Sequence, residues 1–148
     1  MDKKILIQNL LHALDVRISV LANNIESLKE ARNNETKSSV GDKYETGRAM
    51  AQMELEKNQE QLSQTENRKT TLLRINPETQ HDTVEFGSLV KTNQNTYFIS
   101  IPMGKIELKE EAVYCLSPVS PISRILSGRK AGDTVTFQDK NIQIRQII

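Results

Sequence analysis

A regular spacing of apolar side chains in the N-terminal half limits this chain to very few folds. The residues recur at alternating intervals of four and three, like the seam of a coiled coil: Ile7, Leu11, Leu14, Ile18, Leu21, Ile25 and Leu28. No Gly precedes Gly41 and no Pro precedes Pro77, so the sequence contains no helix breaker before residue 41. The pattern predicts one long amphipathic helix.

A second, weaker seam predicts a partner for this helix. Its members include polar residues: Ala51, Leu55, Asn58, Leu62, Thr65, Lys69 and Leu72. Residues 33–42, between the seams, are rich in turn and capping residues. Because a short turn makes two helices antiparallel, we expect a helical hairpin with its tip near residues 38–46. Each arm of about 30 residues would extend on the order of 45 Å.

The composition changes sharply near residue 76. All four prolines, four of the six glycines and five of the six aromatic residues come after it. The charge balance does not change, since residues 1–76 carry 12 basic and 11 acidic groups and residues 77–148 carry 8 of each. We therefore expect an antiparallel coiled-coil hairpin in residues 1–76 and a second domain in residues 77–148 that folds alone.

The second half predicts short strands around one short helix. Ser120 can cap a helix that starts at Pro121 and ends at Gly128. Gly87 indicates a bend inside a strand. The expected strands are rich in β-branched and aromatic residues: 83–86 with 89–90, 96–101, 112–116, 134–137 and 142–147. The predicted fold class is α+β, with a mostly antiparallel sheet after the hairpin.

Composition also excludes several classes of protein. The formal net charge is +1, without the excess of Lys and Arg that marks a general nucleic-acid binder. No apolar run approaches the ~18 residues of a membrane span, and the N-terminus lacks the features of a signal peptide. The single cysteine, Cys115, excludes an intramolecular disulfide and a Cys-rich zinc site. We expect a soluble cytoplasmic protein.

Two carboxylates lie at the predicted tip of the hairpin. Asp42 and Glu45 are three residues apart, so both would point the same way at the start of the second helix. One interpretation is a capping pair that complements the helix dipole. The other is a pair of oxygen ligands for a divalent cation such as magnesium, which often takes only one or two ligands from protein. The two interpretations are compatible, and a partner would have to supply the remaining ligands.

The remaining candidate residues give weaker signals. His12 and His81 lack metal-ligand spacing and predict solvated or locally hydrogen-bonded side chains. Cys115 lies in an apolar run and predicts a small core residue. Residues 128–133 match neither the phosphate-loop pattern nor the dinucleotide pattern. The sequence therefore predicts no self-contained active site.

Three stretches together resemble a known family. Residues 120–135 contain Ser-Pro-Ile, a short helix ending in Gly, then Gly-Asp and a strand. Residues 86–90 are similar to the strand that opens the family's C-terminal domain, and Gly41–Glu45 matches its tip at the glycine and both acids. Over nearly its whole length the chain resembles the bacterial Gre family of transcript-cleavage factors.

The resemblance implies a function in transcription elongation. An FKBP-like C-terminal domain would dock on RNA polymerase beside its secondary channel, through Ser120, Pro121 and Ile122. The coiled coil would enter the channel, where Asp42 and Glu45 would help hold a magnesium ion shared with the polymerase. There they would stimulate hydrolysis of the nascent RNA of a backtracked complex. The chain would not itself be an enzyme, because the endonuclease activity belongs to the polymerase.

The sequence departs from the family pattern directly after the tip. Residues 46–49 read Thr-Gly-Arg-Ala in place of Asn-Ala-Glu-Tyr. Arg48 lies one turn after Glu45 and could pair with it, and Gly47 weakens the start of the helix. A second hypothesis is therefore a regulator that occupies the same channel without cleavage and competes with cleavage factors. A third is a folding catalyst, which would need an aromatic-lined pocket, and a fourth is a coiled-coil adaptor.

Overall fold

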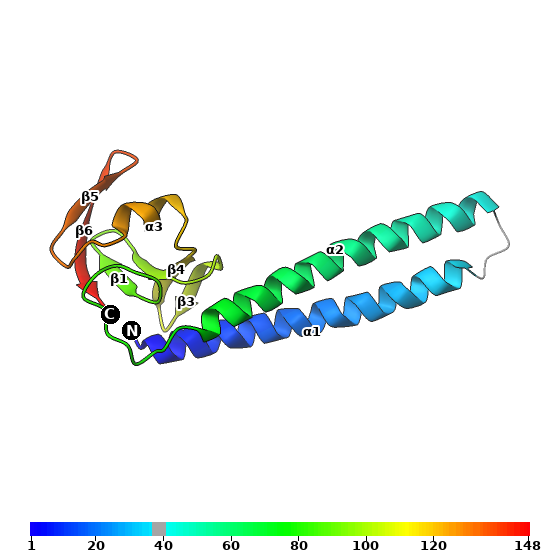
Figure 1. Cartoon of the computed structure of the whole chain (residues 1–148), viewed down its shortest axis with the longest axis horizontal. Helices are drawn as coiled ribbons and strands as arrows, with labels where there is room; N and C mark the ends of the chain where they lie inside the picture. The colour runs from blue at the N-terminus through cyan, green and yellow to red at the C-terminus, as the bar shows by residue number, and fades with distance from the viewer. Residues whose placement is uncertain (37–40) are drawn as a thin grey trace. The chain divides into compact units, whose positions relative to one another are not determined.

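Two long helices and a six-stranded sheet make up the protein (Figure 1). The computed structural model describes residues 1–36 and 41–148, and the side chains of these residues except 35, 36 and 41–44. Helices α1 (Lys3–Thr36) and α2 (Gly41–Leu73) pack as a hairpin, and the sheet with its one short helix follows. The predicted α+β class is confirmed.

The seam predicted for α1 is present. Leu14, Leu21 and Ile25 are buried, and the seam positions between and beyond them, Leu11, Ile18 and Leu28, are half-buried. At the N-terminus, Asp2 caps the helix, since its Oδ1 accepts a hydrogen bond from the Lys4 amide at 2.8 Å. The four–three spacing therefore predicted both the helix and its buried side.

The polar members of the α2 seam have partners. Thr65 is buried, and its hydroxyl donates to the Gln61 carbonyl of the preceding turn at 2.7 Å. Asn58 donates in the same way to the Glu54 carbonyl at 2.8 Å. Lys69 reaches across to α1, where its Nζ lies 2.6 Å from Asp15 Oδ1. Because each polar group is satisfied, the weaker seam can still pack against α1.

Helix α1 is apolar enough on average to meet one criterion for a membrane span. By length and mean composition alone, Lys3–Asn34 could cross a membrane, although the core helix of a soluble protein passes the same test. The helix contains no long uninterrupted apolar run, but an average tolerates isolated charges. The seam of α1 packs toward α2, and Asp15 on this helix pairs with Lys69. Since 28% of the most apolar window is buried inside the protein, this packing covers part of the apolar surface of the helix.

The sheet has the strand order β3-β4-β2-β1-β6-β5. Its elements are β1 (Leu89–Thr92), β2 (Thr96–Ile99), β3 (Gly104–Leu108), β4 (Glu111–Leu116), α3 (Pro121–Leu126), β5 (Thr134–Phe137) and β6 (Lys140–Ile147). Neighbouring strands are antiparallel except β2 and β4. That pair is parallel because the chain leaves β2, forms the edge strand β3 and returns through a hairpin into β4.

The strand predictions need two corrections, because the first part of one predicted strand is absent and one observed strand was not predicted. Residues 83–86 do not form a strand: only Thr83 makes an isolated bridge, to Lys130. A turn follows, in which Gly87 has a φ of +91° and the Ser88 hydroxyl donates to the Glu85 carbonyl at 2.7 Å. Strand β3 was missed although its sequence alternates, since the charged Lys105 and Glu107 are exposed and the apolar Ile106 and Leu108 are half-buried.

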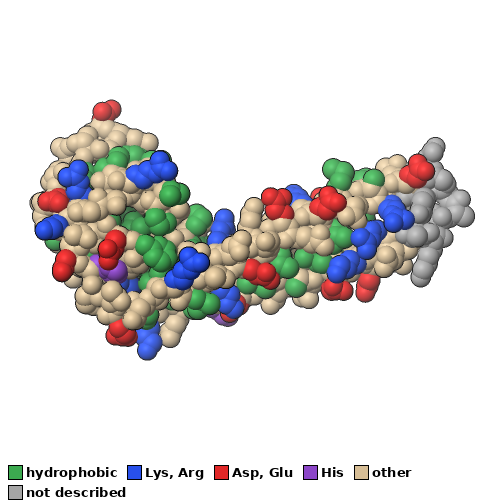
Figure 2. Space-filling view, viewed as in Figure 1, with side chains coloured by type: hydrophobic (Ala, Val, Ile, Leu, Met, Phe, Trp, Pro, Cys, Tyr) green, Lys and Arg blue, Asp and Glu red, His purple; other side chains and the backbone are tan. Residues whose placement is uncertain are grey.

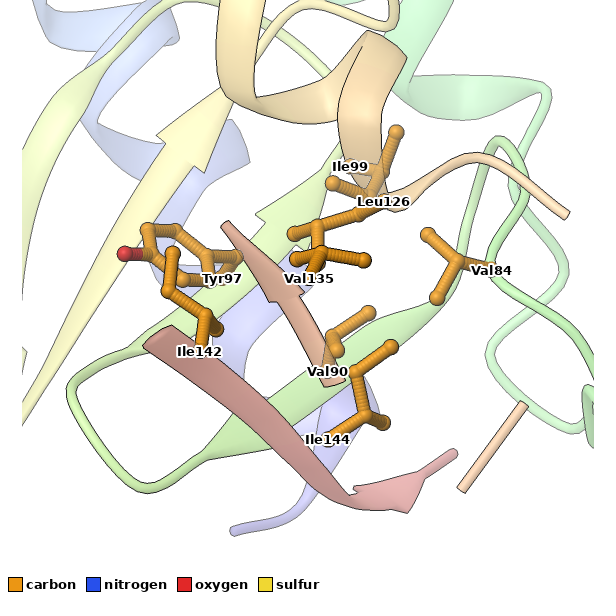
Figure 3. Packing of buried hydrophobic residues seen from close by; sticks show 8 residues of the cluster. All are labelled: Val84, Val90, Tyr97, Ile99, Leu126, Val135, Ile142 and Ile144. Carbon is orange, nitrogen blue, oxygen red and sulfur yellow. The ribbon is translucent and has the colours of Figure 1, made fainter. Parts of the chain in front are cut away.

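One core cluster lies between the sheet and α3. The Ser120 cap and the Pro121 start of α3 are as predicted, and Gly128 after the helix has a φ of +77°, which favours glycine. Strands β1, β2, β5 and β6 supply most of the buried side chains, and Leu126 comes from α3 (Figure 3). The cluster consists of Val84, Val90, Tyr97, Ile99, Leu126, Val135, Ile142 and Ile144.

The opposite face of the sheet is equally buried. Alternation along the strands directs Leu89, Phe98, Val113 and Cys115 away from α3, and all four are 0% exposed. The same compact unit also buries Ile101, Leu72 near the end of α2 and Ile75 just after it, together with Leu6, Ile7 and Leu10 of α1.

The chain divides into two compact units, and the boundaries between them lie within the two long helices rather than after them. Residues 1–10 and 70–148 form one compact unit, called here the sheet unit, and residues 11–69 form the other, the hairpin unit. Within the sheet unit, the buried Lys3 donates from Nζ to the Thr79 carbonyl at 3.0 Å. That residues 77–148 fold alone stays a prediction.

Candidate functional site

The predicted tip acids lie at the start of α2. This helix begins at Gly41, so Asp42 is its second residue and Glu45 its fifth, and the two acids lie three residues apart near its N-terminus. The side chain of Glu45 is exposed, and that of Asp42 lies outside the described residues. Both acids are at the end of the helix where the macrodipole favours negative charge. Because Asp42 lies inside the helix rather than at its N-cap, the placement is compatible with acids that complement the helix dipole and with a ligand role.

The surroundings of Glu45 give it access to solvent. Arg48, one turn further along α2, is also exposed, and Gly47 is half-buried. From Glu45 to Lys69, within the hairpin unit, α2 rises about 36 Å at 1.5 Å per residue. Glu45 therefore lies close to one end of that unit, far along the helix from the Asp15–Lys69 ion pair.

The chemistry available at the tip is that of carboxylate oxygens. Magnesium prefers oxygen ligands and six-coordinate geometry, and two carboxylates supply only part of such a set. No group of three or more His, Cys, Asp or Glu that could hold a metal ion occurs among the described residues. Figure 2 shows basic and acidic side chains interspersed along the visible face of the hairpin, without a field of one sign.

The second predicted site, the docking segment, lies at the start of α3. Ser120 accepts a hydrogen bond on Oγ from the Ser123 amide at 3.3 Å, and its hydroxyl donates to Ser123 Oγ at 2.7 Å. Pro121 is exposed, and Ile122 is half-buried against the core cluster. The three residues thus have different functions locally: Ser120 is a cap, Pro121 is a surface residue and Ile122 belongs partly to the core.

A small cavity lies beside Ile122, and the sequence did not predict it. Its volume is about 170 Å³, and its lining is half apolar and half polar: Tyr97, Ile122, Phe137 and Ile142 with Gln94, Asn95, Gln138 and Lys140. Asn95 at the rim donates from Nδ2 to the Tyr97 hydroxyl at 3.2 Å. The cavity needs residues from β2, α3 and the β5–β6 hairpin, so no local signal in the sequence could have revealed it.

The two histidines and the cysteine have the structural roles predicted for them. His81 is locally hydrogen-bonded, with Nδ1 2.6 Å from Glu85 Oε1, and His12 is exposed. Cys115 is 0% exposed, and burial raises the pKa of its thiol to about 12. At that pKa the thiol is a packing group and a poor nucleophile.

No protein-family model matches this chain, and no curated protein matches it either. The architecture is nevertheless that of the predicted type, an N-terminal helical hairpin followed by a mixed sheet domain, which is consistent with Gre-like architecture. The tip and the docking segment belong to different compact units, since Glu45 lies in residues 11–69 and Ser120 in residues 70–148. The structure therefore offers two separate candidate sites.

Proposed function

We propose that this chain is a transcription elongation factor that binds RNA polymerase at its secondary channel and stimulates cleavage of backtracked RNA. The observation that carries the proposal is the placement of two acids, Asp42 and Glu45, within the first five residues of a helix of 33 residues. The exposed Glu45 supports it, because a group that works in a partner's site must be accessible in the free protein.

The tip acids would complete a site that the polymerase largely provides. Asp42 and Glu45 would hold a magnesium ion shared with the polymerase, and their hard oxygen donors fit this ion. When bound, such an ion helps neutralise charge during hydrolysis of a phosphodiester. The acids' own contribution is to bring negative charge to the nascent RNA's cleavage site and to orient water there by accepting its hydrogen bonds.

Docking would use the start of α3 and the cavity beside it. Pro121 is exposed, and Ile122 lines the 170 Å³ cavity together with polar residues such as Gln94 and Lys140, so a polymerase group with both apolar and polar atoms would fit there. Ser120 would act indirectly, because its hydroxyl fixes the start of the helix. Substitution of Pro121 therefore tests docking with less effect on the fold than substitution of Ser120.

The deciding experiment is RNA cleavage in stalled, backtracked polymerase complexes. At saturating factor, Asp42→Ala and Glu45→Ala should each lower stimulated cleavage by roughly 10²–10³-fold, the usual cost of losing one charged group in a catalytic site. Glu60→Ala is the matched control, because Glu60 is an exposed acid on α2 about four turns from the tip. It should cleave like the parent.

Binding to the polymerase separates the two parts of the proposal. The tip variants should bind with unchanged affinity, whereas Pro121→Glu should bind at least tenfold more weakly while its melting temperature is preserved. If the parent binds the polymerase but never stimulates cleavage, the proposed cleavage function is wrong. The second hypothesis, a non-cleaving regulator that competes with cleavage factors, then replaces it. If the parent does not bind, both functions are wrong.

A further inference from the structure

The apolar seam of the hairpin stops before the tip. On α1 its last apolar member is Leu28, and the next position in the four–three pattern is occupied by Arg32. On α2 the seam begins with Ala51, which like Leu28 is half-buried. From Arg32 onward α1 reads Arg-Asn-Asn-Glu-Thr, without an aliphatic residue. Among the side chains that the structure describes, the buried or half-buried apolar seam therefore ends at Leu28 on α1 and at Ala51 on α2.

A polar cluster replaces the seam at this level. The part-buried guanidinium of Arg32 donates from Nη1 to Gln52 Oε1 at 3.0 Å, which joins α1 to α2. The other end of the same amide donates from Nε2 to Glu56 Oε1 at 3.0 Å, along α2. The contact lies nearer the tip than two further polar contacts between the helices, Arg17 with Gln61 and Asp15 with Lys69.

The chemistry of the cluster fixes the amide in one orientation. A guanidinium can only donate and a carboxylate can only accept, so Gln52 must turn its oxygen to Arg32 and its nitrogen to Glu56. Hydrogen bonds to charged groups are about twice as strong as neutral ones. Polar residues at single seam positions also fix helix register, at some cost in stability. The cluster thus suits a positioning role better than a stabilising one.

We propose that Arg32, Gln52 and Glu56 form a clamp that positions the tip acids for cleavage. Gln52 lies seven residues from Glu45, about 10 Å along α2. With this clamp, the end of the hairpin holds Glu45 in one position. Without it, Glu45 occupies a range of positions. The functional part of this inference rests on the proposed function, and the structural part does not. Arg32, Gln52 and Glu56 are positioning residues, since none of them touches the reacting atoms.

The structural part is tested in the free, full-length protein. Nitroxide labels at Glu30→Cys and Met53→Cys, both exposed positions near the clamp, report the distance between the helices. Cys115 will not compete for the label, because it has no exposed surface. Arg32→Met and Gln52→Leu should broaden the distance distribution. Arg17→Met, which removes an equivalent guanidinium–amide bond at 3.1 Å farther from the tip, should not broaden it.

The functional part is tested by cleavage at varied factor concentration. Arg32→Met and Gln52→Leu should lower the maximal cleavage rate by about 10- to 100-fold, the scale expected for an ångström-level misplacement. The concentration for half-maximal effect should not change. Gln52→Glu keeps an acceptor for Arg32 but loses the donor to Glu56 and places two carboxylates four residues apart on α2, so it should restore only part of the rate that Gln52→Leu loses. Arg17→Met should lose about as much stability as the clamp variants and should still cleave at the parental rate.

The outcomes separate this inference from the proposed function. Unchanged distance distributions in both clamp variants would overturn the clamp. Broadened distributions with parental cleavage rates would overturn its positioning role. If the parent itself never stimulates cleavage, the positioning role fails together with the proposed function, and the distance measurement still decides the clamp.

Discussion

Leu6 tests whether the first turns of α1 belong to the sheet unit. It has no exposed surface and lies in residues 1–10, which are compact with residues 70–148. Leu14, two turns later, is 2% exposed and lies in the hairpin unit. The two leucines therefore form a matched pair, alike in residue type, helix and burial, and different only in the unit to which they belong.

The expected cost of truncation is large enough to measure by amide exchange. A buried Leu→Ala change costs about 2–5 kcal/mol, depending on how well the cavity collapses. At about 3 kcal/mol, exchange through opening of the affected unit accelerates roughly 10²-fold, since 1.4 kcal/mol is a factor of ten. For Leu6→Ala this acceleration should appear at the Ile99 amide of β2, which donates to the Ser88 carbonyl at 3.0 Å.

Native-state hydrogen exchange, measured by heteronuclear NMR, reports the opening of both units in one experiment. Leu6→Ala should accelerate exchange at Ile99, and Leu14→Ala should accelerate it at Leu62 in α2 while leaving Ile99 within a few-fold of the parent. If Leu6→Ala leaves Ile99 unchanged, the start of α1 does not support the sheet. If both variants accelerate both amides equally, the protein opens as one unit and the division is wrong.

Three further predictions concern stability. Ser120→Ala should lower the free energy of unfolding by about 1 kcal/mol, because α3 loses its N-cap, as chemical denaturation will show. Burial lowers the pKa of Lys3 from 10.5, so the unfolded chain binds more protons just below that pH. Stability of the parent should therefore rise as pH increases toward 10.5, and Lys3→Met should flatten this rise; parallel curves would contradict it. The turn at Gln138 and Asp139 has φ values of 49° and 62°, so an Asn-Gly pair there should raise the free energy of unfolding by about 1 kcal/mol, measured as a higher melting temperature.

Periodic features of the fold were predictable from local sequence. The spacing from Leu11 to Leu28 predicted α1 and its buried side, and Ser120 with Pro121 predicted the start of α3. These signals work because a helix repeats every 3.6 residues and its caps need specific side chains, so both are recorded in consecutive residues. The candidate tip site was found in the same way, from acids three residues apart at a turn.

Further features were decided only by residues that are distant in sequence. Lys3 gave no sign that its ammonium would be buried, since its acceptor, the Thr79 carbonyl, is 76 residues away. The cavity depends on Ile122 of α3, Tyr97 of β2 and Phe137 of β5, which only the folded domain brings together.

The sequence by itself determined the helical hairpin, the change to strands near residue 76 and the position of Asp42 and Glu45 at a helix start. The tertiary structure alone decided that the helix ends, including Leu6 and Leu72, are compact with the sheet. It also decided that Arg32, which occupies the seam position after Leu28, donates a hydrogen bond to Gln52 of α2. The physical reason is range: helix periodicity and capping act over a few residues, whereas burial and cross-helix hydrogen bonds depend on which surfaces meet after folding.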